Sequence, residues 1–140
     1  MTDNLELIND SILFLLKPKS SIGYLESRRT LRQALEKMRY YGYTALPVVD
    51  EQGRYAGTVS EGDFLWHMLN EKEYDIYSRE KHSLKEIIRP EFNPAVRVSA
   101  KIDDLIDRVM SQNFVPVIDD QDVLMGIITR QDVIHYLKNR

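Results

Sequence analysis

The apolar positions near residue 30 recur at the spacing of an amphipathic helix. They lie three or four positions apart: Leu31, Ala34, Leu35 and Met38. This spacing predicts a helix over residues 30–41. Thr30 precedes it with Gln33 three positions later, which is a capping-box pattern, and Gly42 is placed to end it.

Two runs rich in β-branched residues follow this helix, over Ala45–Val49 and Tyr55–Val59. Asp50–Gly53 reads as a turn, so the two runs predict a hairpin, although Pro47 removes one backbone donor. Apolar residues at helical spacing then predict a second helix over Glu61–Leu69. With residues 22–26 extended and a lead-in helix at Ser11–Leu16, the unit is β-α-β-β-α.

The same order of elements is predicted again in the second half. Its ranges are a lead-in helix at 83–88, an extended segment at 95–98, a helix at 102–110, strands at 115–118 and 124–128, and a helix at 130–138. Ser83 with Glu86 predicts another capping box. Each half is marginal alone on surface-to-volume grounds, so we expect the two to pack as one module.

The residues themselves are repeated as well. Leu46–Asp50 returns 69 positions later as Val115–Asp119, whereas Lys17-Pro18 returns 72 positions later as Arg89-Pro90. The second copy therefore lacks three residues between Met110 and Pro116. We predict an α/β (α+β) fold of two pseudo-symmetric repeats, with boundaries 11–70, 71–82 (a charged connector) and 83–140.

Composition narrows the function classes. The 140-residue chain has a net charge of −3 and no cysteine, which argues against a nucleic-acid surface and excludes disulfides and thiolate chemistry. Ile12–Leu16 is too short to span a bilayer, and no basic leader of a signal peptide precedes it. We expect a cytoplasmic protein with no membrane role.

One motif that could form a functional site occurs in both copies, where the last strand meets the last helix. Its residues are Gly57, Ser60 and Asp63, then Gly126, Thr129 and Asp132. A hydroxyl with an acid three residues later is also a plain helix N-cap, and capping alone would explain either copy. The functional alternative is a nucleotide site, because a helix N-terminus suits phosphate and a carboxylate suits ribose hydroxyls. The glycines would let a ligand approach the strand closely.

With these motifs duplicated in register, the sequence resembles the paired cystathionine-β-synthase (CBS) domains, or Bateman modules, from about Ser11 onward. The resemblance implies a small-molecule sensor and not an enzyme. Such pairs bind adenosine-containing ligands in clefts between their repeats and commonly dimerise into a disc. Asp63 and Asp132 would then hold ribose hydroxyls, with Ser60 and Thr129 near phosphate.

The resemblance also implies the residues of two ligand sites. Site 1 comprises Ser21, Ile22, Gly23, Tyr24, Tyr43, Thr44, Ala45, Pro47, Ser60 and Asp63. Site 2 comprises Ala95, Val96, Phe114, Val115, Pro116, Thr129, Arg130 and Asp132.

The two sites are not expected to be equivalent. Phe114 stands where the first copy has Ala45, and its ring either stacks on a base or, as we favour, fills the pocket. Site 1 is therefore the better candidate. Arg130 opens the last helix, where a cation opposes the helix dipole; it either serves an anion or is a solvated surface residue.

No catalytic or metal-binding constellation stands out. His67, His82 and His135 do not form a metal pattern, so we expect surface or interface roles for them and no metal. No Ser-His-Asp order or paired-carboxylate spacing is apparent, and we expect neither enzymatic activity nor a cofactor.

The leading hypothesis is thus a sensor of AMP, ADP or ATP that signals to an effector protein through a ligand-dependent arrangement of its repeats, as a homodimer. One alternative is a cyclic di-AMP-binding regulator of a partner enzyme, because Gly42–Pro47 is similar to that type; retention of Asp132 favours linear nucleotides. Another alternative is a structural dimerisation or docking module with degenerate pockets. No nucleic-acid partner is expected.

Overall fold

The computed structural model describes residues 11–70 and 82–139, which form two compact units. The first-repeat unit consists of Gly23–Phe92. The second-repeat unit combines the segment up to Ile22 with the segment from Asn93 onward.

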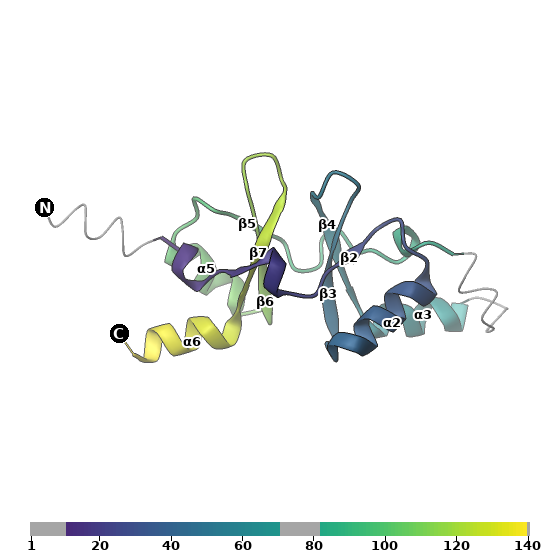
Figure 1. The fold of residues 1–140 in the computed structure, drawn as a ribbon. Coiled ribbons are helices and arrows are strands. Elements are labelled where there is room, and N and C mark those ends of the chain that lie inside the picture. The colour runs from purple at the N-terminus through teal and green to yellow at the C-terminus, as the bar shows by residue number, and fades with distance from the viewer. Residues whose placement is uncertain (1–10, 71–81, 140) are drawn as a thin grey trace, which may run out of the picture. The chain divides into compact units, whose positions relative to one another are not determined.

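The first-repeat unit has a three-stranded sheet in the order β2-β3-β4. Its elements are β2 (Leu25–Glu26), α2 (Leu31–Tyr41), β3 (Ala45–Val49), β4 (Tyr55–Ser60), α3 (Glu61–Asn70) and the 3-10 turn η3 (Leu84–Glu86). Strand β2 runs parallel to β3, and β3 pairs antiparallel with β4 with Leu46 opposite Val59. Both α2 and α3 contribute to the core that covers this sheet (Figure 1).

Local signals explain where α2 begins and ends. The Thr30 hydroxyl accepts from the Gln33 N–H at 3.2 Å, and the Gln33 side chain accepts from the Thr30 N–H at 3.0 Å. Gly42 ends the helix in the left-handed conformation at φ 70°. The predicted capping box and helix end are confirmed. Both depend on a few neighbouring residues, so the local sequence was sufficient to predict them.

The second-repeat unit repeats this order and adds one strand, giving a sheet in the order β1-β7-β6-β5. Its elements are η1 (Leu13–Leu15), β1 (Lys17–Pro18), η2 (Lys19–Ser21), β5 (Val96–Arg97), α5 (Ile102–Val109), β6 (Phe114–Ile118), β7 (Leu124–Thr129) and α6 (Arg130–Lys138). Strand β1 pairs antiparallel with β7, with Lys17 opposite Ile127. The α/β fold class with its duplicated β-α-β-β-α order is confirmed.

The lead-in segments differ from the prediction in two ways. Both are 3-10 turns of three residues instead of α-helices. Each also packs with the other repeat: Ile12 lies in the core of the second-repeat unit, and Leu84 and Ile87 lie in the core of the first. The compact units therefore divide the chain at different places from the repeat boundaries predicted from the sequence.

The capping box predicted at Ser83 is wrong. The Ser83 hydroxyl accepts from the Lys85 N–H at 3.0 Å, as suits a single tight turn. The Glu86 carboxylate lies instead 2.7 Å from Nδ1 of His82.

Nearly all of the predicted connector over 71–82 lies outside the described residues. Within the described ranges, each helix is too short or too polar to cross a bilayer.

Candidate functional site

The motif of the first-repeat unit forms a cluster where β4 meets α3. The Ser60 N–H and hydroxyl donate to Oδ2 of Asp63 at 2.7 and 3.1 Å, which is the reciprocal half of a capping box. Arg89 Nε lies 2.8 Å from the other oxygen, Oδ1. The Asp63 side chain is only 11% exposed, so this carboxylate is held by the protein from both sides.

The second-repeat unit builds the same cluster with different contacts. The Thr129 hydroxyl accepts from the Asp132 N–H at 3.2 Å and caps α6. The Asp132 carboxylate pairs with Lys17 Nζ at 3.5 Å. Its side chain is 35% exposed, three times the exposed fraction of Asp63. Asp132 is therefore the more accessible of the two carboxylates.

Each carboxylate thus has a basic partner from the lead-in segment that packs on its unit. Lys17 and Arg89 are the repeated Lys17-Pro18 and Arg89-Pro90 positions, 72 residues apart. This repetition is visible in the sequence, but no role for Arg89 could be predicted from it. A basic residue before a proline occurs in both lead-in segments, and this repetition was the available signal. The sequence did not reveal which carboxylate each basic residue contacts, because each lead-in segment packs on the other repeat.

The glycines of the motif serve the lead-in backbone. A Cβ on Gly57 would lie 2.8 Å from the Arg89 carbonyl oxygen, and one on Gly126 would overlap the Lys17 carbonyl. Thr58 forms an antiparallel bridge with Arg89, as β7 does with β1. The expectation that these glycines admit a ligand is corrected: the neighbouring chain segment already occupies that space.

The remaining predicted residues of site 1 divide between the two units. Ser21 and Ile22 belong to the second-repeat unit. In the first-repeat unit, the exposed Tyr43 ring stacks parallel to Tyr41 at 6.0 Å between centroids. Lys37 Nζ lies 4.8 Å from the centre of the Tyr24 ring.

The other members of site 1 are distinguished by burial. Gly23 is buried, and a Cβ there would overlap the Tyr41 ring. Pro47 is also buried, whereas Thr44 is exposed and Ala45 is partly exposed.

Several predicted residues of site 2 point into the core. Val96 and Val115 belong to the core cluster of the second-repeat unit. Phe114 is 9% exposed, in keeping with a ring that fills space, and Pro116 is buried, while Ala95 is partly exposed.

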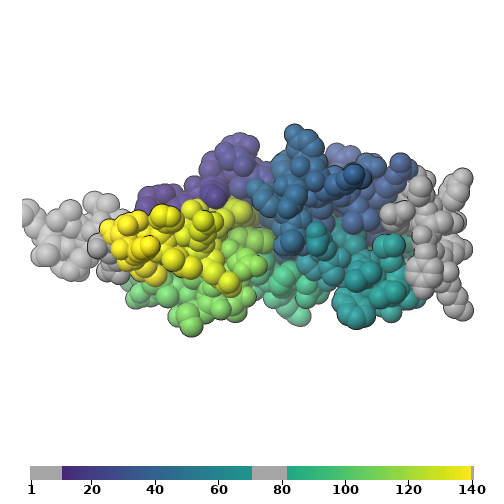
Figure 2. All heavy atoms as spheres, turned by 90° about the horizontal axis from the view of Figure 1, so that it is seen from below, coloured from purple at the N-terminus to yellow at the C-terminus, as the bar shows by residue number. Residues whose placement is uncertain are grey.

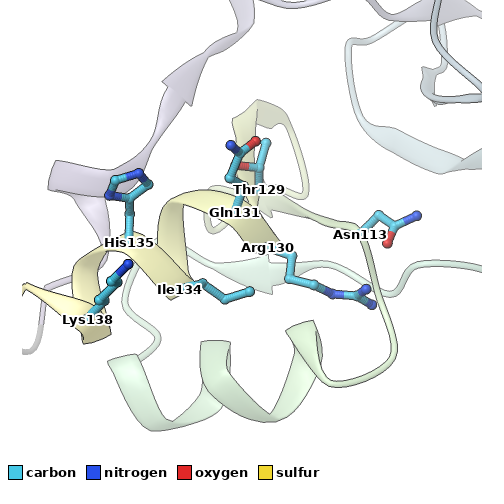
Figure 3. Close-up of a pocket in the computed structure, with 7 residues that line it drawn as sticks. All are labelled: Asn113, Thr129, Arg130, Gln131, Ile134, His135 and Lys138. Carbon is cyan, nitrogen blue, oxygen red and sulfur yellow. The ribbon is translucent and has the colours of Figure 1, made fainter.

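Arg130 bridges two elements. Its Nε donates to the Val109 carbonyl at 2.7 Å, where α5 ends and carbonyls lack helical partners. Its own N–H donates to the Asn113 carbonyl at 2.8 Å. Figure 3 shows the side chain extending from α6 toward the loop that carries Asn113. It is therefore neither a free surface residue nor committed only to an anion.

Arg130 also borders a surface hollow of about 540 Å³. The hollow is lined by Asn113, Thr129, Arg130, Gln131, Ile134, His135 and Lys138 (Figure 3). Two cationic side chains and a helix N-terminus make this surface suitable for an anion.

Comparison with known proteins identifies both repeats. The model of the family described as the CBS domain matches residues 19–70 and 84–139. The uncharacterised protein MJ1225 of Methanocaldococcus jannaschii is 28% identical over 123 residues, covering 79% of this chain and 44% of that protein. The chain thus spans less than half the length of this curated relative.

Solved structures share the fold. CbpB in complex with c-di-AMP aligns with a TM-score of 0.87 and 17% identity, covering 99% of this chain and 91% of that one. CBSX2 in complex with AMP aligns with a TM-score of 0.75 and 23% identity, covering 93% of this chain and 97% of that one. At these identities the similarity concerns the fold alone.

Proposed function

Because the chain belongs to the CBS domain family, we propose that it is a regulatory, non-catalytic module that binds an adenine nucleotide. The observation that supports this most directly is the duplicated cluster at the start of α3 and of α6. Each cluster combines a hydroxyl, a carboxylate and a cation: Ser60, Asp63 and Arg89, then Thr129, Asp132 and Lys17.

These groups match the parts of a nucleotide. A guanidinium or ammonium can pair with phosphate, and the helix N-terminus favours the same charge. A carboxylate accepts from ribose hydroxyls. Nucleotide binding would then transfer Arg89 or Lys17 from the carboxylate to phosphate and leave the carboxylate free to accept from the sugar. The greater exposure of Asp132 makes this exchange easier in the second-repeat unit.

The carboxylates favour a linear nucleotide of the AMP, ADP or ATP type. A linear nucleotide offers two adjacent ribose hydroxyls to one carboxylate. In a cyclic dinucleotide joined through 3′ and 5′ positions, the 3′ oxygen is esterified and only one hydroxyl remains. Both repeats keep the aspartate. Structures of this fold hold AMP in one case and c-di-AMP in another, so both ligands belong in the test.

We also propose that the module acts as a homodimer and passes its state to an effector protein. Large apolar side chains are exposed on one helix of each unit: Leu65, Trp66 and Leu69 on α3, and Ile134 and Leu137 on α6. Figure 2 shows α6, in yellow, at the surface. Exposed apolar patches commonly mark association surfaces. The ligand would favour one arrangement of the repeats, which the effector protein recognises.

The test is thermal unfolding of the purified chain with AMP, ADP, ATP, S-adenosylmethionine and c-di-AMP. A ligand at 100 times its Kd should stabilise the native state by about 2.7 kcal/mol. Asp63→Ala and Asp132→Ala should each remove the stabilisation contributed by their own unit. Asp107→Ala, which removes an exposed carboxylate on α5, is the matched control and should respond like the unaltered chain.

Light scattering on the same samples gives the mass, and a monomer would contradict the homodimer.

The outcomes separate the hypotheses. A shift with c-di-AMP alone would replace the linear nucleotide with the cyclic one. If no ligand stabilises the chain, the nucleotide proposal fails and a docking module remains. Without ligand, loss of a cap should lower the free energy of unfolding by only about 1 kcal/mol.

A further inference from the structure

We propose that His67, His82 and Glu86 form a binding site for a divalent transition-metal ion of the zinc type. Each offers one ligand atom, and these three atoms lie within 4.8 Å of one another. All three residues belong to the first-repeat unit, and none belongs to the clusters at Asp63 or Asp132. This site is independent of nucleotide binding. It was missed in the sequence because 14 residues separate the two histidines.

The fold holds these side chains in place through the core. Phe64 is 3% exposed and lies one turn before His67, so both residues are on the inward side of α3. Leu84, which is fully buried, fixes the turn between His82 and Glu86. The His82 carbonyl also accepts from the N–H of Leu31, at the start of α2, at 3.0 Å. The ligands are thus supported by three elements.

The side-chain contacts bring the ligand atoms close to their final positions. Nδ1 of His82 lies 2.7 Å from the Glu86 carboxylate, and the rings of His67 and His82 are 5.1 Å apart between centroids. Ligands around one tetrahedral zinc ion, bound at about 2.0–2.2 Å, lie about 3.3 Å from each other. Small side-chain rotations therefore suffice. The Glu86 side chain is 45% exposed, which leaves solvent access for a water as the fourth ligand.

The duplicated unit shows that the fold does not require ionisable groups at two of these three positions. His67 corresponds to Tyr136, 69 positions later, and Glu86 corresponds to Phe14, 72 positions earlier. Phe14 and Tyr136 pack as an aromatic pair with centroids 5.0 Å apart. Where the second-repeat unit has an aromatic contact, the first-repeat unit has imidazole and carboxylate ligands.

The ligand set indicates the class of metal. Imidazole nitrogen suits zinc, copper, iron and nickel, whereas magnesium and calcium prefer sites made of oxygen. Two histidines, one carboxylate and a water match a three-ligand zinc site. An ion there would link α3 to η3 and stabilise the first-repeat unit.

The experiment is calorimetric titration of Zn²⁺ into tag-free protein stripped of metal, with Co²⁺ absorption as the spectroscopic readout of coordination. We expect one ion per chain, a higher unfolding midpoint with Zn²⁺, and intense Co²⁺ ligand-field bands. His82→Ala and Glu86→Gln should weaken binding at least about tenfold. His67→Tyr should do the same, and it introduces the side chain that the second repeat tolerates at this position. His135→Ala removes the remaining histidine and is the matched control.

Two results would overturn the site. One is an unaltered chain that gives neither Zn²⁺ heat nor Co²⁺ bands. The other is His67→Tyr or His82→Ala binding Zn²⁺ as tightly as the unaltered chain. Urea unfolding of each variant without metal shows whether it remains folded, so that lost binding is assigned to the ligand.

Discussion

At the scale of single residues, equivalent positions of the two units can hold side chains of different chemistry. Tyr55 begins β4 where β7 has Leu124, which is 1% exposed. The Tyr55 hydroxyl lies 2.6 Å from Oγ1 of the fully buried Thr58 and donates to the Phe92 carbonyl at 3.2 Å. Burial raises the pKa of Tyr55 to about 12. The first-repeat unit therefore contains a polar pair made of the partly buried Tyr55 and the fully buried Thr58.

This raised pKa predicts a loss of stability at alkaline pH. The unfolded tyrosine ionises near pH 10, so its contribution is complete below pH 10 and is lost as pH rises toward 12. At pH 11 the free energy of unfolding should be lower by about 1.4 kcal/mol from this group. Urea unfolding at pH 8 and pH 11 measures the change. Tyr55→Phe should show a smaller drop, and an equal drop would contradict the assignment.

The predictions that succeeded for individual residues depended on local contacts. Thr30, Gln33 and Gly42 act within one helix, so their spacing was sufficient. The contact of Arg130 with the Val109 carbonyl joins residues 21 positions apart and depends on how α5 and α6 meet. The local sequence around Arg130 contains no information about how these two helices pack.

At the scale of elements, the lead-in segment defines the environment of the site. In the second-repeat unit, β1 pairs with the edge of β7 at Pro18 and Gly126, and it brings Lys17 to Asp132. In the first-repeat unit, the bridge between Thr58 and Arg89 does the same for Asp63. A two-residue strand is too short to give a periodic signal, which explains why the sequence did not predict it.

A side chain at Gly126 should disturb this pairing. The Cβ of Gly126→Ala would overlap the Lys17 carbonyl, so β1 must shift and the free energy of unfolding should fall by about 1–3 kcal/mol. Gly62→Ala is the matched control, because its Cβ would lie 3.6 Å from the Ser60 hydroxyl, an ordinary contact at the start of α3. It should be neutral or stabilising by up to about 1 kcal/mol. Denaturant unfolding compares the two; a Gly126→Ala chain as stable as the control would show that β1 is not closely packed.

At the scale of the whole molecule, the sequence repeat and the compact structural unit have different boundaries. The repeat could be predicted from the sequence because its motifs recur at fixed offsets. The exchange of lead-in segments could not, because Ile12 and Leu84 are equivalent apolar residues that would fit either core. Only the path of the chain through space decides which core each one enters.

This difference predicts which piece of the chain folds alone. A polypeptide of residues 23–92 keeps the complete core of its unit, including Leu84 and Ile87. A polypeptide of residues 11–70, which follows the sequence repeat, lacks both. Loss of one large core side chain costs about 2–5 kcal/mol, comparable to the total stability of a small domain. We therefore expect cooperative urea unfolding, followed by circular dichroism, for 23–92 and none for 11–70. Leu84→Ala within 23–92 should weaken or abolish that transition, whereas cooperative unfolding of 11–70 would mean that the lead-in is not part of the core.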